Sequence, residues 1–151
     1  MGSLFIHLPI GEFASTHFIG AGVGYSWSNK RFGVQIARLA RPISFSADAG
    51  IDFFAGRSEK VAGYQFRYGS YWYGHVMGGM IYNVSRKANI RLLAGPTVSM
   101  YKNSIRAGIG ARVDGSYYFT EKIGISPVVF FRKHEMTSAL WSVGVSANYV
   151  F

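Results

Sequence analysis

The sequence contains no cysteine, and long apolar runs are missing as well. Without thiols the chain cannot form disulfides, zinc–thiolate sites or a thiol nucleophile. Although 49% of the residues are hydrophobic, no stretch reaches the roughly 20 consecutive apolar residues that a membrane-spanning helix requires. The apolar residues are therefore distributed along the chain, and their spacing carries the information about the fold.

Acidic residues are scarce: 7 Asp and Glu stand against 16 Lys and Arg, which gives a formal charge of +9. A basic chain is typical of nucleic-acid binding or of contact with anionic lipid headgroups. Most of the cations fall between the apolar runs or at their ends, without forming one continuous basic face. This distribution argues against nucleic acid as a partner and leaves lipid phosphate contact or simple solvation.

Glycine (19 residues) and aromatic residues (12 Phe, 10 Tyr and 3 Trp) are abundant, as expected for strands and turns. Apolar residues alternate with small or polar ones at a period of two, so that strand side chains of each kind share a face. The segment 138–151 shows this most clearly: Trp141, Val143 and Val145 lie on one face, and Ser142, Gly144 and their neighbours lie on the other.

Eight such runs cover most of the chain, at 3–10, 17–27, 43–55, 70–84, 88–101, 104–119, 122–133 and 138–151. Most reach the length of about 9–11 residues that a tilted membrane strand needs. The sequence predicts one all-β domain over 1–151, an eight-stranded antiparallel up-and-down transmembrane β-barrel. The long connection 28–42 is predicted as a short interfacial helix or a strand extension; otherwise the first strand is misplaced and the register of the N-terminal third changes.

Charge separates the two faces of the predicted strands. The apolar face has no charge within any strand body, and the opposite face collects Asp48, Asp52, Arg91, Arg106, Arg112, Asp114 and Arg132. Glycine and serine accompany these charges, which suits the cramped interior of a small barrel, while aromatic residues lie near the strand ends as in membrane barrels. We therefore predict a lumenal charge network, either a salt-bridged plug or a narrow ion pathway.

The strand number, the alternation and the ending from Trp141 to Phe151 resemble the small eight-stranded outer-membrane proteins of the OmpX/Ail and OmpA transmembrane-domain type. Small Bacteroidetes-type barrels are similar as well. The resemblance implies a bacterial outer-membrane location, with the signal peptide removed, because none is visible at Met1. It also implies a periplasmic C-terminus in which Tyr149 and Phe151 form the signal read by the barrel assembly machinery.

The predicted function is a non-enzymatic envelope structural or interaction module that contacts outer-membrane lipid, lipopolysaccharide or a protein partner. The OmpX/Ail resemblance implies adhesion through protruding segments, and only the external connection 56–69 is long enough to protrude. Its basic and aromatic residues are the predicted contacts: Lys60, Tyr64, Phe66, Arg67 and Tyr68.

Three alternatives stay open: a lipid A-modifying enzyme, a narrow pore and a soluble ligand-binding barrel. An enzyme of this kind needs a His and a Ser together at the lipid side; His134 lies near Ser138, and His17 follows Thr16. The tighter His-x-Ser motif of barrel deacylases is missing, so no catalytic residue is predicted. The sequence also predicts no cofactor and no metal site.

Overall fold

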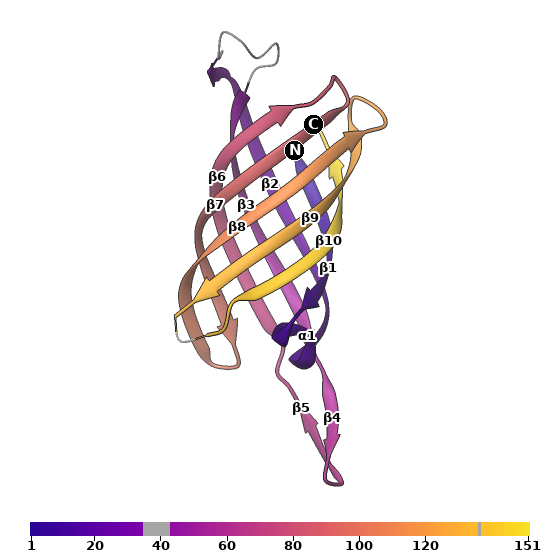
Figure 1. Ribbon diagram of the computed structural model, residues 1–151, viewed down its shortest axis with the longest axis vertical. Helices are drawn as coiled ribbons and strands as arrows, with labels where there is room; N and C mark the ends of the chain where they lie inside the picture. Colours follow the sequence, from indigo (N-terminus) through magenta and orange to yellow (C-terminus); the bar gives the residue numbers. More distant parts are fainter. Residues whose placement is uncertain (35–42, 136) are drawn as a thin grey trace.

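The computed structural model describes residues 1–34, 43–135 and 137–151. Its elements, shown in Figure 1, are β1 (Gly2–Ile10), α1 (Glu12–Thr16), β2 (His17–Val34), β3 (Ile43–Gly56), β4 (Ser58–Val61), β5 (Tyr64–Arg67), β6 (Tyr71–Asn83), β7 (Ala88–Tyr101), β8 (Ser104–Tyr118), β9 (Ile123–His134) and β10 (Leu140–Tyr149). No helix in the described ranges is long and apolar enough to cross a membrane.

Eight strands form a closed barrel in the order β1-β10-β9-β8-β7-β6-β3-β2. The first and last strands close it as an antiparallel pair that runs from Gly2 opposite Tyr149 to Ile10 opposite Trp141, and β1 also pairs with β2. Closure satisfies the backbone hydrogen bonds of every barrel edge, which hydrocarbon would otherwise leave unpaired at a cost of several kcal/mol per group. The predicted eight-stranded antiparallel barrel is confirmed.

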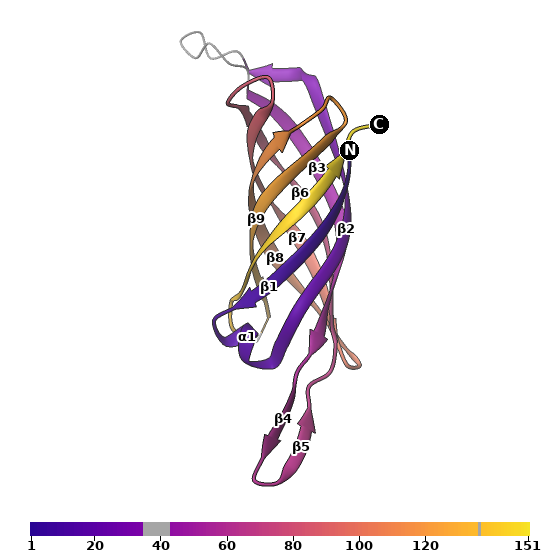
Figure 2. The same ribbon diagram turned by 90° about the vertical axis from the view of Figure 1, so that its right-hand side faces the viewer.

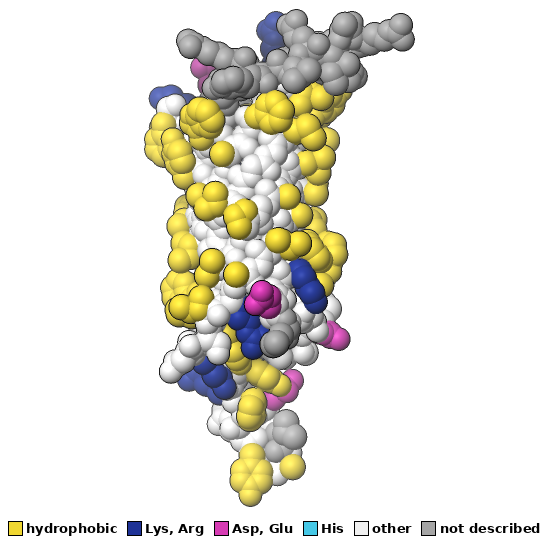
Figure 3. All heavy atoms as spheres, turned by 90° about the vertical axis from the view of Figure 1, so that its left-hand side faces the viewer, with side chains coloured by type: hydrophobic (Ala, Val, Ile, Leu, Met, Phe, Trp, Pro, Cys, Tyr) yellow, Lys and Arg dark blue, Asp and Glu magenta, His cyan; other side chains and the backbone are white. Residues whose placement is uncertain are grey.

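The apolar side chains point outward, as the alternation predicts. Ile51, Ile109 and Val143 expose 47%, 64% and 37% of their surface, respectively. The alternate positions are buried in the lumen and are mostly serine, histidine, aspartate and arginine. Figure 3 shows hydrophobic side chains over the body of the barrel, with charged side chains gathered toward its ends. This inverted arrangement is that of an outer-membrane barrel.

The N-terminal third keeps the predicted first strand. Strand β2 extends past Trp27 to Val34, so the first part of 28–42 is a strand extension, and 35–42 lies outside the described residues. The register of β2 against β3 shifts between His17 and Gly20 and again between Asn29 and Val34.

The two ends of the barrel differ (Figures 1 and 2). Both chain termini lie at one end, here called the inner end, and α1 with the β4–β5 hairpin lies at the other, the outer end. The connection 56–69, predicted without strands of its own, contains this hairpin, which projects beyond the barrel. Its two-residue turn places Ala62 and Gly63 at φ of 49° and 85°, the left-handed conformation of the tight turns that join hairpin strands.

Candidate functional site

The lumen is filled by a network of ion pairs and hydrogen bonds. Asp48 accepts two parallel bonds from Arg112, Nη1 to Oδ1 at 2.8 Å and Nη2 to Oδ2 at 3.0 Å. His75 contacts Oδ1 of Asp48 through Nε2 at 2.9 Å, and the hydroxyl of Ser26 donates to Oδ2. A buried carboxylate requires such partners, since an isolated buried charge costs several kcal/mol.

The other two lumenal carboxylates are held in the same way. Asp114 bridges Nε of Arg91 at 2.6 Å and Nε of Arg112 at 3.0 Å. Asp52 contacts Nη2 of Arg132 at 3.3 Å and Nε2 of His7 at 3.0 Å.

All six of these Arg and Asp side chains are 2% exposed or less. Three arginines balance three aspartates, so the formal excess of nine positive charges arises outside this network.

Arg106 is placed apart from the other predicted network residues. Its side chain is exposed at the outer end of β8, where Nη1 donates to the backbone carbonyl of Glu135 at 3.2 Å. The parity of the strand gives Arg106 the lumenal register, but there β8 has run past the enclosed part of the barrel. The predicted set therefore contains six lumenal charges and one rim cation.

An aromatic layer closes the lumen toward the outer end. The guanidinium of Arg132 lies 4.2 Å from the ring centre of Tyr73 and 4.5 Å from that of Phe130. Above them α1 inserts Phe13, whose ring centre is 5.0 Å from that of Phe54 and 5.5 Å from that of Tyr71. Phe13 was not predicted from the sequence, because it belongs to a five-residue helix in the short connection between the predicted strands 3–10 and 17–27.

The two His–Ser/Thr pairings considered for catalysis differ in the structure. His134 faces the lumen, 1% exposed, and contacts Tyr71 and Thr97 at 3.2 Å each. Ser138 is exposed and makes no hydrogen bond to it.

The second pairing is formed in part. Thr16 contacts Nδ1 of His17 at 2.8 Å, but the opposite ring nitrogen of His17 is buried and meets no hydrogen-bond partner in the described ranges. Neither pairing supplies the nucleophile, base and orienting acid of a hydrolase.

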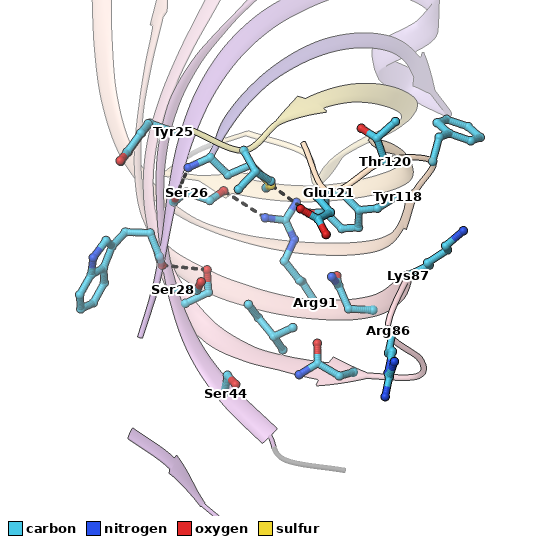
Figure 4. Close-up of a pocket in the computed structure, with 18 residues that line it drawn as sticks. Tyr25, Ser26, Ser28, Ser44, Arg86, Lys87, Arg91, Tyr118, Thr120 and Glu121 are labelled. Atoms are coloured by element: carbon cyan, nitrogen blue, oxygen red, sulfur yellow. Dashed lines mark hydrogen bonds between the residues drawn. The ribbon is translucent and has the colours of Figure 1, made fainter. Parts of the chain in front are cut away.

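A pocket of about 690 Å³ opens at the inner end. We call it the inner pocket; Figure 4 shows Arg91 within it, Ser26, Ser28 and Ser44 on the β2–β3 side, and Arg86 and Lys87 in the turn after β6. Arg91 donates through Nη1 to the hydroxyl of Ser26 at 3.0 Å. The pocket is thus the open end of the charge network.

The outer hairpin carries the residues predicted to meet a partner. Tyr64 and Phe66 are 82% and 55% exposed, Lys60 and Arg67 are exposed beside them, and Tyr68 at the base is half-buried. The ring of Phe66 packs on that of Tyr68 at 5.2 Å. The structure therefore brings the five predicted contact residues onto one projecting element.

The two residues predicted as an assembly signal lie at the inner end. Phe151 is 82% and Tyr149 45% exposed, and their ring centres are 5.3 Å apart. Phe151 also stacks on Tyr25 of β2 at 6.4 Å. The C-terminal aromatics thus contribute to the aromatic rim on the outside of the barrel.

No protein-family model and no curated protein matches the chain, whereas several solved structures share its fold. The outer membrane enzyme PagL has a TM-score of 0.64 at 9% identity, with 99% of each chain covered. The attachment invasion locus protein Ail of Yersinia pestis, in complex with the heparin analogue sucrose octasulfate, has a TM-score of 0.61 at 9% identity, covering 99% of this chain and 96% of Ail. Ail in a phospholipid nanodisc gives 0.59 at 12% identity, covering 99% of this chain and 98% of Ail. The chain therefore has the fold of the small eight-stranded outer-membrane β-barrels.

Proposed function

We propose that the protein is a non-enzymatic interaction module of the bacterial outer membrane, which binds the phosphate groups of lipopolysaccharide with its outer end. The observation that carries this proposal is the projecting β4–β5 hairpin with its exposed cations and aromatic rings. The two kinds of neighbour, the enzyme PagL and the attachment protein Ail, share one fold. The fold alone therefore does not determine the function, which depends on the residues that the surface presents.

Further cations are exposed at the outer end of the barrel, outside the hairpin strands. Arg57 lies over the ring of Phe18 at 5.6 Å, and Lys102 lies over that of Tyr101 at 5.7 Å. Arg106 is exposed on the same end. These positions border the lipid-facing surface, where cations meet headgroup phosphates and gain from charge-assisted hydrogen bonds.

A complex of Ail with a polysulfated sugar supports the same chemistry, because sulfate and phosphate groups are both tetrahedral anions carried on sugars. The exposed rings of Tyr64 and Phe66 add flat apolar surfaces next to the cations. A sugar ring packs on such surfaces through its apolar face. The combination therefore fits a phosphorylated glycolipid better than a free inorganic anion.

A lipid-binding test needs variants that keep the barrel intact. We expect Arg57→Gln/Lys60→Gln/Arg67→Gln to weaken binding of purified lipopolysaccharide to the refolded protein by about tenfold or more, since each ion pair lost contributes up to roughly 1 kcal/mol. Binding to the unchanged protein should also weaken with salt. Arg86→Gln/Lys87→Gln at the inner end is the matched control. Equal affinity of all three proteins would refute the proposal.

A protein partner is the second candidate, favoured by the free edges of the β4–β5 hairpin, which pairs only with itself among the described strands. The backbone N–H of Tyr68 already donates to the carbonyl of Arg57 at 2.9 Å. Replacing 58–67 by an Asn-Gly turn should therefore leave the barrel closed. Lipopolysaccharide binding that survives this deletion, together with lost attachment to host cells, would favour the protein partner.

The proposal of a non-enzymatic role rests on the separation of His134 from Ser138. We expect no fatty acid release from lipid A in detergent, and no difference between the unchanged protein and Ser138→Ala. Acyl release that disappears in Ser138→Ala would make the protein an enzyme.

A further inference from the structure

The inner pocket contains a buried cation with an unused donor. Arg91 is 2% exposed, and its Nε and Nη1 bind Asp114 and Ser26. Its remaining terminal nitrogen, Nη2, is buried and has no hydrogen-bond partner among the described residues. Buried donors in native proteins are paired in about nine cases of ten or more. The unused donor is therefore a group that an acceptor in the pocket would satisfy.

A second unpaired group lies in the lining of the same pocket. The side-chain oxygen Oδ1 of Asn89 is also buried and has no partner within the part of the chain that the structure describes. Arg91 thus offers a charged donor and Asn89 offers an acceptor from strand β7, on which the two residues share a face. A ligand with an anionic oxygen and a hydroxyl group would satisfy both at once.

The charge around the pocket favours an anion. Arg86 and Lys87 are exposed in the turn between β6 and β7 and line the pocket together with Arg91. Glu121 is the acidic residue among the lining side chains. Hydroxyls of Ser28 and Ser44 complete a polar wall (Figure 4). The net charge of the lining residues is therefore positive, which favours an anion. The uncharged serine hydroxyls among them suit the hydroxyl groups of a polyol.

The pocket also lies at the level of the inner interface. Trp27 and Phe119 expose 57% and 59% of their surface at this end of the barrel, and exposed aromatic side chains of this kind mark the headgroup region of membrane barrels. The volume of about 690 Å³ falls within the roughly 300–1,000 Å³ of small-molecule sites. We propose that the inner pocket binds a small phosphate-bearing polyol of glycerol phosphate size, either free or as a phospholipid headgroup.

Side-chain NMR of the refolded protein in phosphate-free detergent tests this site directly. Titration with glycerol phosphate should shift the Nε–H signal of Arg91 and the side-chain amide of Asn89 in a saturable way. Arg86→Gln/Lys87→Gln should bind about tenfold more weakly, because two exposed ion pairs are lost. Lys60→Gln/Arg67→Gln, at the outer end, should bind unchanged. No saturable shift, or the same shift with sodium chloride at equal ionic strength, would overturn the proposal.

A second variant separates binding from folding. Asn89→Ala removes the unpaired acceptor without removing a charge, so it should keep the barrel folded and weaken glycerol phosphate binding. Equal binding by this variant would contradict the assigned contact. The site lies at the opposite end from the hairpin, so its failure would leave the lipopolysaccharide proposal standing.

Nanodiscs distinguish the two sources of the phosphate. In phosphatidylglycerol nanodiscs, one outcome is that the Nε–H signal of Arg91 already lies at its bound position and does not respond to added glycerol phosphate. This result would identify the lipid headgroup as the ligand. A shift upon addition in both phosphatidylglycerol and phosphatidylcholine nanodiscs would identify the free molecule. Either outcome supports phosphate binding, whereas an Arg91 signal unchanged in every lipid and by the added molecule contradicts it.

Discussion

Gly22 lies so close to Asp52 that a side chain on the glycine would occupy the position of the carboxylate. A Cβ atom placed on Gly22 would be 2.0 Å from Oδ1 of Asp52 and 2.8 Å from the backbone oxygen of Ile51. The lumenal glycine of β2 is therefore what gives the ion network its space. The same strand places Gly20 against the ring of Phe54, where a Cβ would meet Cε1 at 2.5 Å.

We expect Gly22→Ala to destabilise the barrel by about 1–3 kcal/mol, as overpacking of a filled interior does. Gly115→Ala is the control, because a Cβ at Gly115 meets nothing within 4 Å. Urea unfolding of both variants in lipid vesicles, followed by tryptophan fluorescence, gives the comparison. A Gly22→Ala protein as stable as Gly115→Ala would show that the carboxylate of Asp52 is free to move.

Breaking the ion pair of Arg112 with Asp48 is expected to destabilise the barrel more than Gly22→Ala does. Arg112→Met leaves Asp48 with a buried charge and without its bidentate partner. Breaking a buried pair in this way typically costs about 3–5 kcal/mol. The double variant Asp48→Asn/Arg112→Met should recover part of the loss, since no uncompensated carboxylate remains at Asp48.

The control for the ion pair is a cation of the same strand outside the network. Arg106→Gln changes an exposed side chain of β8 and should alter stability by no more than about 0.5 kcal/mol. Heat-modifiable migration in gels reports folding for the whole set. A double variant less stable than Arg112→Met alone would contradict the pairwise account of Asp48 and Arg112.

Alternation was enough to assign each barrel residue to a face, because a strand with one side in lipid and the other in a packed lumen repeats strictly at two residues. Ile109 and Arg112 illustrate it: an odd separation places them on opposite faces, 64% and 1% exposed. Most barrel strands were therefore predictable close to their ends, whereas β2, predicted to end at Trp27, continues to Val34.

The features that the sequence did not predict lie where strict alternation stops constraining the residues. The residues of β5 are exposed throughout, so this strand has no buried face, and the turn of the hairpin uses Ala62-Gly63 rather than the Asn-Gly typical of hairpins. Arg106 shares the parity of Arg112 but lies past the enclosed lumen. The pairing of His7 with Asp52 joins residues 45 positions apart across β2, a contact set by the registers of β1, β2 and β3 that no local pattern contains.

The lipid-facing surface predicts that the stability cost of a charged substitution depends strongly on the depth of the residue in the membrane. Val129, in the middle of β9, is 40% exposed, and Ile123, at the inner end of the same strand and on the same face, is 52% exposed. We expect Val129→Arg to cost about 2–4 kcal/mol and Ile123→Arg about 0–1 kcal/mol, because an arginine near the interface reaches water. Unfolding of both variants in vesicles measures the difference. Equal costs would mean that β9 does not cross hydrocarbon.

The sealed lumen predicts a protein that does not conduct ions. The pairs of Arg132 with Asp52 and of Arg112 with Asp48 are buried and neutral, and the Phe13 ring closes the outer end above them. Planar-bilayer recordings of the refolded protein should show no discrete current steps. Phe13→Ala should stay silent as well, because the layer of Phe130 and Arg132 lies beneath it. Reproducible unitary steps that are abolished by heat denaturation would instead make the ion network a pathway that opens in the membrane.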